Sequence, residues 1–548
     1  MIRRREAALA GALASLGLAG GAAEGDSVRV DARAQRRGIS PLIYGVNWAS
    51  PQQLDALNAP LNRHGGNATS RYHWQLNASN RGRDWYFQST PWPDAKPGEA
   101  ADSFVRDSRD SRAEPMLTIP MLRWAARLGP ERAKLASFSI AKYGPQAGHD
   151  AQWFPDAGNG LRSDGTPVTG NDPTDANQRV GMAHQRRWLQ HLVARWGRAG
   201  HGGVRYYLLD NEPSIWHSTH RDVQPVGLKM RELRDRIIET ASMIKSVDRG
   251  ALVLGPEEWG WSGYFHSGFD LQWGARHGWR QPLPDRAANG GVPYLPWLLQ
   301  QLRRAHERSG RRLLDVFSVH FYPQGGESSD DVSPAAQRLR NRSTRSLWDP
   351  GYQDESWIDD RVMLIPRLRE WVREYYPGTA IGITEYDWGA QQHISGALAQ
   401  ADVLGIFGRE RLDLATRWEA PAMDSPAFNA MRLYRNYDGA RSTFGDTSIE
   451  ASVADPDRLA AFAAERGHDG ALTIMLLNKE LDEARPVRLQ VQPFGERDGV
   501  AQRWQLTARN VIEREPDVRA GNGHWQLTLP ARSISLLVLP KAPGQRRP

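Results

Sequence analysis

The chain of 548 residues contains no cysteine. This absence excludes a disulfide scaffold, a thiol nucleophile, cysteine-ligated zinc and iron–sulfur chemistry. A chain of this length buries enough apolar surface to fold without disulfide or metal cross-links. Lysine is also scarce, because only seven of the 70 lysine and arginine residues are lysine, and no basic run occurs. The net charge of +7 is therefore carried by scattered arginines, which argues against a nucleic-acid partner.

Long apolar runs are scarce as well, and the N-terminus has the pattern of an export signal. Three arginines at residues 3–5 precede an uncharged stretch over residues 7–19, and small residues follow up to Ala23. Such a segment is too short to span a bilayer and is typical of a secretory signal peptide. We therefore expect residues 1–23 to be removed and the mature protein to be secreted or periplasmic, without a membrane segment.

Eight short apolar runs between residues 40 and 440 each end in polar or aromatic residues. Because these runs lack polar alternation, we expect burial on both faces, as in a parallel sheet. Helical patterns separate most of them, so the sequence predicts an α/β fold, a (β/α)8 TIM barrel over residues 39–438. The runs cover residues 43–46, the surroundings of 61, 116–120, 206–209, 252–255, 316–319, 381–384 and 412–416.

The pattern changes after residue 438. Short runs of alternating polarity, such as residues 487–491 and 533–539, replace the helical periodicity. They predict an antiparallel β-sandwich domain over residues 439–548. Residues 24–38 contain a similar alternating stretch, which we expect to be a strand that joins this sandwich.

Two glutamates occupy positions that suit glycosidic-bond cleavage. Glu212 follows the fourth predicted strand and Glu385 follows the seventh, so they face each other across the mouth of an eight-stranded barrel. Cleavage with retention needs two carboxyl groups about 5–5.5 Å apart. Asn211 directly precedes Glu212, where its amide can bind a sugar 2-hydroxyl. The sequence therefore predicts Glu212 and Glu385 as the catalytic pair.

The chain has 21 tryptophans, which is an unusually high number for its length. Several follow predicted strands, and flat indole rings suit the faces of sugars. The roles of Glu257 and Glu258 stay open. Either they are a helix-cap acid and an exposed acid, or they act at the site by binding substrate or tuning the pKa of Glu212. His320 orients the nucleophile or is structural. The predicted substrate-binding residues are Asn47, Trp48, Asn211, Glu258, Trp259, Tyr322, Trp388 and Trp418.

A turn-rich segment over residues 143–177 is too long for an ordinary connection, so we expect a functional loop or small subdomain at the catalytic rim. Its hard-oxygen side chains are compatible with a structural Ca²⁺ ion, but a turn rich in Asx residues is the favoured explanation. The predicted chemistry itself needs no cofactor. The sequence does not determine which residues would bind a metal ion. The candidate oxygen ligands are Asn171, Asp172, Asp175 and Asn177.

Five sequence blocks together resemble glycoside hydrolase family 44. They occur in order over residues 30–440, and the C-terminal sandwich agrees with the same family. The blocks are YGVN at 44–47, GGNATSRY at 65–72, DNEP at 210–213, GPEEWG at 255–260 and TEY at 384–386.

This resemblance implies a retaining, endo-acting β-1,4-glucanase with Glu212 as acid/base and Glu385 as nucleophile. The implied partner is a β-glucan polysaccharide such as carboxymethylcellulose, mixed-linkage glucan or xyloglucan, and the enzyme is expected to be a monomer. Two alternatives remain: the same chemistry on mannan or xylan, and a catalytically silent glycan-binding protein.

Overall fold

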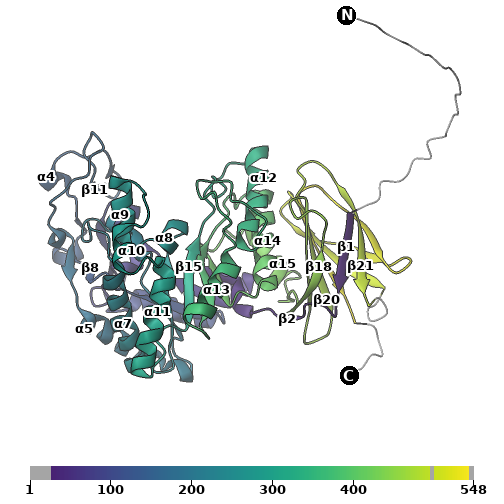
Figure 1. Cartoon of the computed structure of the whole chain (residues 1–548), viewed down its shortest axis with the longest axis horizontal. Helices are drawn as coiled ribbons and strands as arrows, with labels where there is room; N and C mark the ends of the chain where they lie inside the picture. Colours follow the sequence, from purple (N-terminus) through teal and green to yellow (C-terminus); the bar gives the residue numbers. More distant parts are fainter. Residues whose placement is uncertain (1–25, 494–498, 542–548) are drawn as a thin grey trace, which may run out of the picture.

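The computed structural model of the protein describes residues 26–493 and 499–541. The predicted signal peptide at residues 1–23 lies outside the described residues. Figure 1 shows a barrel surrounded by helices and, beside it along the longest axis, a β-sandwich. Within the described ranges, no helix is both long enough and apolar enough to cross a bilayer.

Eight parallel strands form the closed barrel, and neighbouring strands follow the chain order around it. This confirms the predicted fold class. The first strand begins slightly later than its apolar run, because Pro41–Tyr44 forms a 3-10 turn. The strands are β3 (Gly45–Asn47), β4 (Leu61–His64), β7 (Glu114–Ile119), β13 (Tyr206–Leu209), β14 (Leu252–Glu258), β15 (Val316–Phe321), β16 (Ala380–Tyr386) and β17 (Leu414–Arg417).

Helices follow the strands and cover the outside of the barrel. Their apolar residues recur with helical spacing; in α11, for example, Leu295, Leu298 and Leu302 are all buried against the strands. Side chains such as Leu208 and Met116 point inward and fill the barrel itself. The outer helices are α1 (Pro51–Leu57), α3 (Glu99–Asp110), α5 (Met182–Trp196), α7 (Met230–Val247), α11 (Tyr294–Ser309), α13 (Leu364–Tyr375), α14 (Ile394–Arg409) and α15 (Pro426–Arg435).

Insertions after the barrel strands build additional structure around the mouth. Short helices in them are α2 (Asn67–Ser70), α4 (Ile140–Tyr143), α6 (Trp216–Thr219), α8 (Trp261–Phe265), α9 (Gly268–His277), α10 (Pro284–Ala288) and α12 (Pro334–Arg342). Three small sheets also form, from β5 (Ala78–Asn80), β6 (Gln88–Pro91) and β9 (Leu135–Ala136), from β8 (Trp124–Ala126) and β12 (Asn177–Arg179), and from β10 (His149–Asp150) and β11 (Phe154–Gly158).

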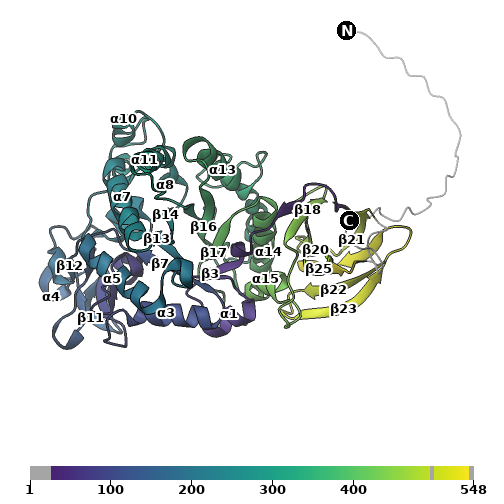
Figure 2. The same ribbon diagram turned by 90° about the horizontal axis from the view of Figure 1, so that it is seen from below.

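The C-terminal strands form the sandwich seen in Figure 2. Its sheet order is β23-β22-β25-β20-β19-β18-β1-β21-β24, with β2 paired to β18. The predicted antiparallel pattern is wrong for one pair, because β1 runs parallel to β21. The strands are β1 (Asp26–Asp31), β2 (Arg37–Gly38), β18 (Thr447–Ser452), β19 (Leu459–Glu465), β20 (Leu472–Asn478), β21 (Arg485–Gln492), β22 (Val500–Leu506), β23 (Ile512–Arg519), β24 (Trp525–Leu529) and β25 (Ser533–Leu539).

Helix α14 connects the two parts of the molecule, because it packs against β18, β19, β20 and β25. Gly405 lets the ring of Phe462 approach, since a Cβ atom there would lie 2.3 Å from the ring. Lys479, directly after β20, places its Nζ atom 2.8 Å from Oδ2 of Asp402 in α14, and both side chains are buried. The barrel and the sandwich therefore share a packed interface with an ion pair inside it.

Asp402→Ala is expected to lower the midpoint of thermal unfolding, because the buried Lys479 ammonium loses its carboxylate. Removing one partner of a buried ion pair costs about 3–5 kcal/mol. Calorimetry checks this against Asp55→Ala, which breaks an exposed pair with Arg441 at 2.9 Å. Such exposed pairs contribute about 0–1 kcal/mol. Equal midpoints for the two variants would contradict the expectation.

Candidate active site

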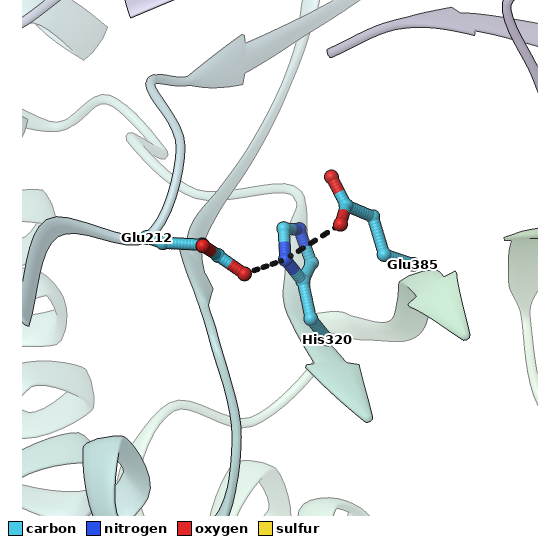
Figure 3. Close-up of side chains that lie close together, drawn as sticks. All are labelled: Glu212, His320 and Glu385. Carbon is cyan, nitrogen blue, oxygen red and sulfur yellow. Dashed lines mark hydrogen bonds and ion pairs between the residues drawn. The ribbon is translucent and has the colours of Figure 1, made fainter. Parts of the chain in front are cut away.

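The carboxyl ends of the barrel strands bring Glu212, His320 and Glu385 together (Figure 3). Glu212 follows β13, His320 lies in β15, and Glu385 lies near the end of β16. Nδ1 of His320 is 3.0 Å from Oε1 of Glu212 and 3.3 Å from Oε2 of Glu385. A carboxylate oxygen of Glu212 lies within 4.8 Å of one of Glu385. Two carboxylates at this spacing can act together on one acetal carbon.

Donors from two other strands hold the Glu385 carboxylate in place. Nη1 of Arg63 donates a hydrogen bond of 2.6 Å to Oε1, and the hydroxyl of Tyr322 donates one of 2.9 Å to Oε2. The Arg63 side chain is fully buried. Charge-assisted bonds of this kind stabilise the negative charge of the carboxylate and orient both its oxygens.

Burial raises the pKa of Glu212, and the nearby carboxylates of Glu385 and Asp84 raise it further, against the hydrogen bond from His320. A carboxyl group with a raised pKa keeps its proton nearer to neutral pH, which suits a general acid. Only 15% of the Glu212 side chain is exposed. The same pair of residues therefore contains one carboxylate held by cationic donors and one carboxyl group that favours protonation.

His320 is a buried cation among carboxylates. Burial by itself lowers the pKa of an imidazole, but the charges and hydrogen bonds of Glu385, Glu212 and Glu257 outweigh it and raise the pKa of His320 to about 9. On its other side, Nε2 of His320 lies 3.4 Å from Oε2 of Glu257. His320 is therefore protonated at neutral pH and in contact with both predicted catalytic residues, which favours the orienting alternative.

Sequence reasoning missed the importance of Arg63 and underestimated Glu257. Glu257 is fully buried, so the expectation of a helix-cap or exposed acid is wrong for it. Nη2 of Arg63 donates a 3.0 Å hydrogen bond to Glu257, and the hydroxyl of Ser318 donates another. Burial, the largest single cause, raises the pKa of Glu257, but Arg63, His320 and Ser318 together outweigh it, so the net pKa is lowered. The signal in the sequence that was overlooked is an arginine at the end of a predicted strand, Arg63, in a barrel whose other strands end in glutamates.

The backbone at the rim is strained where these side chains are presented. Glu212 and Glu257 have φ angles of 48° and 61°, in the left-handed region. Each such residue costs about 1–2 kcal/mol. The N–H of Glu212 donates a 2.9 Å hydrogen bond to the carbonyl of Glu257, so the two strained positions support each other.

The two glycines after β4 make room for side chains of the site. A Cβ atom at Gly65 would lie 2.2 Å from Nη1 of Arg63. At Gly66, where φ is 83°, it would lie 2.5 Å from the ring of Trp418. A side chain at Gly65 would therefore displace the guanidinium that bonds Glu385, and one at Gly66 would displace the Trp418 ring, which explains the two glycines of the GGN block in physical terms.

Three of the predicted substrate-binding residues are buried and contact other parts of the protein, and their contact with substrate stays a prediction. Asn47 is fully buried, and its amide donates hydrogen bonds to the carbonyls of β16 and β17 while accepting one from Arg63. Glu258 is equally buried and accepts hydrogen bonds from Ser214 and Tyr294. Trp388 is 3% exposed and packs in the core. Strand-end position alone does not distinguish rim residues from core residues.

Among the other predicted substrate-binding residues, Asn211 is also buried, with 2% of its surface exposed, and the rest are half-buried at the barrel mouth. The three tryptophans among them, Trp48, Trp259 and Trp418, are half-buried. The indole N–H of Trp48 donates a 3.0 Å hydrogen bond to the carbonyl of Gly65. The amide of Asn211 donates to Oδ1 of Asn67 at 3.2 Å, next to Glu212. Contact with substrate stays a prediction for all of them. These residues are Trp48, Asn211, Trp259, Tyr322 and Trp418.

The proposed calcium ligands are occupied by protein partners. Oδ1 of Asp172 accepts hydrogen bonds from Thr174, and Asp175 contacts Nζ of Lys142 at 2.5 Å and the hydroxyl of Tyr143. Asn171 and Asn177 bond other protein groups as well. Within residues 26–493 and 499–541, the only group of three His, Asp or Glu side chains close enough to share an ion is the predicted catalytic cluster itself. The calcium ion stays a prediction.

Comparisons with known proteins agree with this geometry. The model of glycoside hydrolase family 44 matches residues 78–325. Endoglucanase A of Paenibacillus lautus is 31% identical over 542 residues, covering 93% of this chain and 72% of that protein. A solved bifunctional glucanase-xylanase from a metagenome library is 56% identical, with a TM-score of 0.93 and coverage of 94% of this chain and 99% of that one.

A Paenibacillus polymyxa xyloglucanase of family 44 is 28% identical, with a TM-score of 0.78 and coverage of 94% of this chain and 100% of that chain. These similarities extend over nearly the whole length of the described structure and include both the barrel and the sandwich. They confirm the resemblance seen in the sequence blocks. The chain therefore belongs to glycoside hydrolase family 44 and is a glycoside hydrolase.

Proposed function

We propose that this enzyme is a secreted, retaining endo-β-1,4-glucanase in which Glu212 is the acid/base and Glu385 the nucleophile. The separation of their carboxylate oxygens, within 4.8 Å, is the observation that carries the proposal. It matches the spacing of about 5–5.5 Å of retaining enzymes and is smaller than the roughly 6.5–9.5 Å that leaves room for a water molecule in inverting ones.

In the first step, Glu212 gives its proton to the glycosidic oxygen while a carboxylate oxygen of Glu385 attacks the anomeric carbon. The bond to the leaving oxygen breaks, and a glycosyl ester forms on Glu385. In the second step, Glu212 removes a proton from water, the water oxygen attacks the same carbon, and Glu385 leaves as a carboxylate. These steps need no cofactor, and a calcium ion would have only a structural role.

The hydrogen-bond donors and charges around the two glutamates support this division of roles. Arg63 and Tyr322 orient the attacking carboxylate of Glu385. The raised pKa of Glu212 favours the protonated form that the first step requires. Once Glu385 is esterified, it loses its charge, which removes one of the causes that raise the pKa of Glu212. Glu212 is then more readily ionised, as it must be to accept the proton of the attacking water in the second step.

Xylan is the second candidate substrate, because the relative that is 56% identical is described as a bifunctional glucanase-xylanase. Reactions with carboxymethylcellulose, mixed-linkage glucan, xyloglucan, xylan and mannan, with product mapping, test the substrate class. We expect β-1,4-glucans to lose viscosity before many reducing ends appear, and the first product to have the β configuration by anomeric NMR. An α product at first turnover would overturn the retaining mechanism.

Glu385→Gln is expected to abolish turnover of every substrate, because an amide cannot form the glycosyl ester. Glu212→Gln is expected to lose polysaccharide cleavage but to retain the first step on aryl glycosides with very good leaving groups, which need little protonation. A burst of released phenol followed by slow turnover checks this.

Azide added to Glu212→Ala is expected to restore turnover and to give a β-glycosyl azide, because it replaces the activated water. Glu257→Ala is the matched control and is expected to give no such product. Equal rescue at residue 257 would contradict the assignment of Glu212.

Glu257→Gln is expected to lower the pKa of His320 from about 9, because one of three neighbouring carboxylates disappears. His320 then loses its proton at lower pH, so the alkaline limb of kcat/KM shifts to lower pH. NMR of the ¹⁵N-labelled imidazole and a pH–rate profile measure both effects.

Glu258→Gln is the matched control. Burial raises the pKa of Glu258 to about 8, so this carboxyl is already uncharged near neutral pH and its replacement removes little charge. An unchanged titration of His320 in Glu257→Gln would refute the proposed charge network.

A further inference from the structure

A cavity of about 320 Å³ lies in the insertions beside the barrel mouth. Three tryptophans line it, Trp85, Trp92 and Trp153, together with Arg81 and Lys134. Trp85 is 39% exposed and Trp153 is 60% exposed, which is unusual for such large apolar side chains. We call these five residues and their cavity the tryptophan pocket.

The tryptophan pocket is built by specific contacts between two insertions. The buried carboxylate of Asp150 accepts a 3.2 Å hydrogen bond from Nε1 of Trp85 and a 3.0 Å bond from the backbone N–H of Trp153. Nζ of Lys134 donates to the carbonyl of Trp153 at 3.4 Å. One carboxylate thus holds Trp85, from the insertion after β4, beside Trp153, from the insertion after β7.

The wall of the pocket also contains a polar side chain with an unused acceptor. Gln88 is 2% exposed, and its Nε2 donates a 2.7 Å hydrogen bond to Asp150. Its Oε1 atom is buried and, within the described ranges, has no hydrogen-bond partner. A buried acceptor without a partner is costly. An arriving hydroxyl group would satisfy it.

The pocket is connected to the catalytic centre by short contacts. Asp84, next to Trp85, accepts a 3.0 Å hydrogen bond from Asn67, which in turn accepts one from Asn211 beside Glu212. The ring of Trp92 lies 6.3 Å from that of Trp48 at the end of β3 and is nearly parallel to it. A polymer bound across the barrel mouth on the β3–β4 side would therefore reach the pocket.

We propose that the tryptophan pocket is a distal subsite for a glucan-type chain whose sugars carry carboxylate substituents. This inference rests on the proposed function. Indole faces suit pyranose rings. Arg81 and Lys134 supply positive charge for the carboxylate, while Asp150 is buried and already accepts three hydrogen bonds, and Asp84 accepts one from Asn67. The long turn-rich insertion thereby acquires a role in substrate selection.

The test compares KM on carboxymethylcellulose with KM on an uncharged hydroxyethylcellulose. The double variant Arg81→Gln/Lys134→Gln is expected to raise KM about tenfold on the charged polymer, because a charge-assisted contact of about 1.4 kcal/mol corresponds to a factor of ten. KM on the neutral polymer should stay within about twofold. Trp153→Ala should raise KM on both polymers. A glucuronic-acid-substituted xylan and its neutral counterpart distinguish uronic acid from carboxymethyl substituents.

Matched controls are Trp273→Ala, an exposed tryptophan on α9, and Arg304→Gln, an exposed arginine on α11. Both should leave all KM values unchanged. Equal effects of the double variant on charged and neutral polymers would overturn the acid preference, and no effect of Trp153→Ala would overturn the subsite.

Turnover of a short aryl cellobioside, which cannot reach the pocket, should stay at the wild-type level in all these variants. Loss of that activity in Trp153→Ala would also count against a distal role. If the wild-type enzyme cleaves none of the polymers, the proposed function fails, and retardation of Glu385→Gln in gels containing each polymer then tests the pocket separately.

Discussion

The mouth of the barrel contains a compact arrangement of buried charges, and the site depends on their balance. Glu212, Glu257 and Glu385 lie around Arg63 and His320, with little access to water. Buried carboxylates without cations would take up protons and lose their distinct chemical roles. With the two cations in place, one carboxylate is held by hydrogen bonds from Arg63 and Tyr322 while another favours its protonated form.

The parallel barrel explains how this balance is assembled from distant parts of the chain. The five charged residues come from or directly after β4, β13, β14, β15 and β16, so no pair of strands could bring them together alone. The strained φ angles of Glu212 and Glu257 are maintained by the hydrogen bond between them and by the rigid strands beneath. The stability of the barrel therefore compensates for the unfavourable backbone conformation of these two residues.

Two regions of the structure lie on either side of the catalytic cluster. On one side, α14 is buried between the barrel and the sandwich, with the Lys479–Asp402 ion pair inside the interface. On the other side, insertions after β4 and β7 carry exposed tryptophans beside the mouth. The first arrangement supports the strands that hold the charges, and the second is the surface that we propose distinguishes polymers by their substituents.

The sequence by itself determined the barrel, the sandwich, the family and the identity of the two glutamates that meet. Continuous apolar runs separated by helical patterns leave few alternatives to a parallel barrel, and barrel geometry brings the ends of the fourth and seventh strands together.

Only the tertiary structure decided which rim residues face the cleft. Asn47, Glu258 and Trp388 lie at or just after strand ends, as Glu212 does, yet they are buried, because exposure there depends on the direction of each side chain and on what the insertions cover. The importance of Arg63, the charge of His320 and the meeting of Trp85 with Trp153 likewise result from contacts between residues far apart in the chain, which no local pattern specifies.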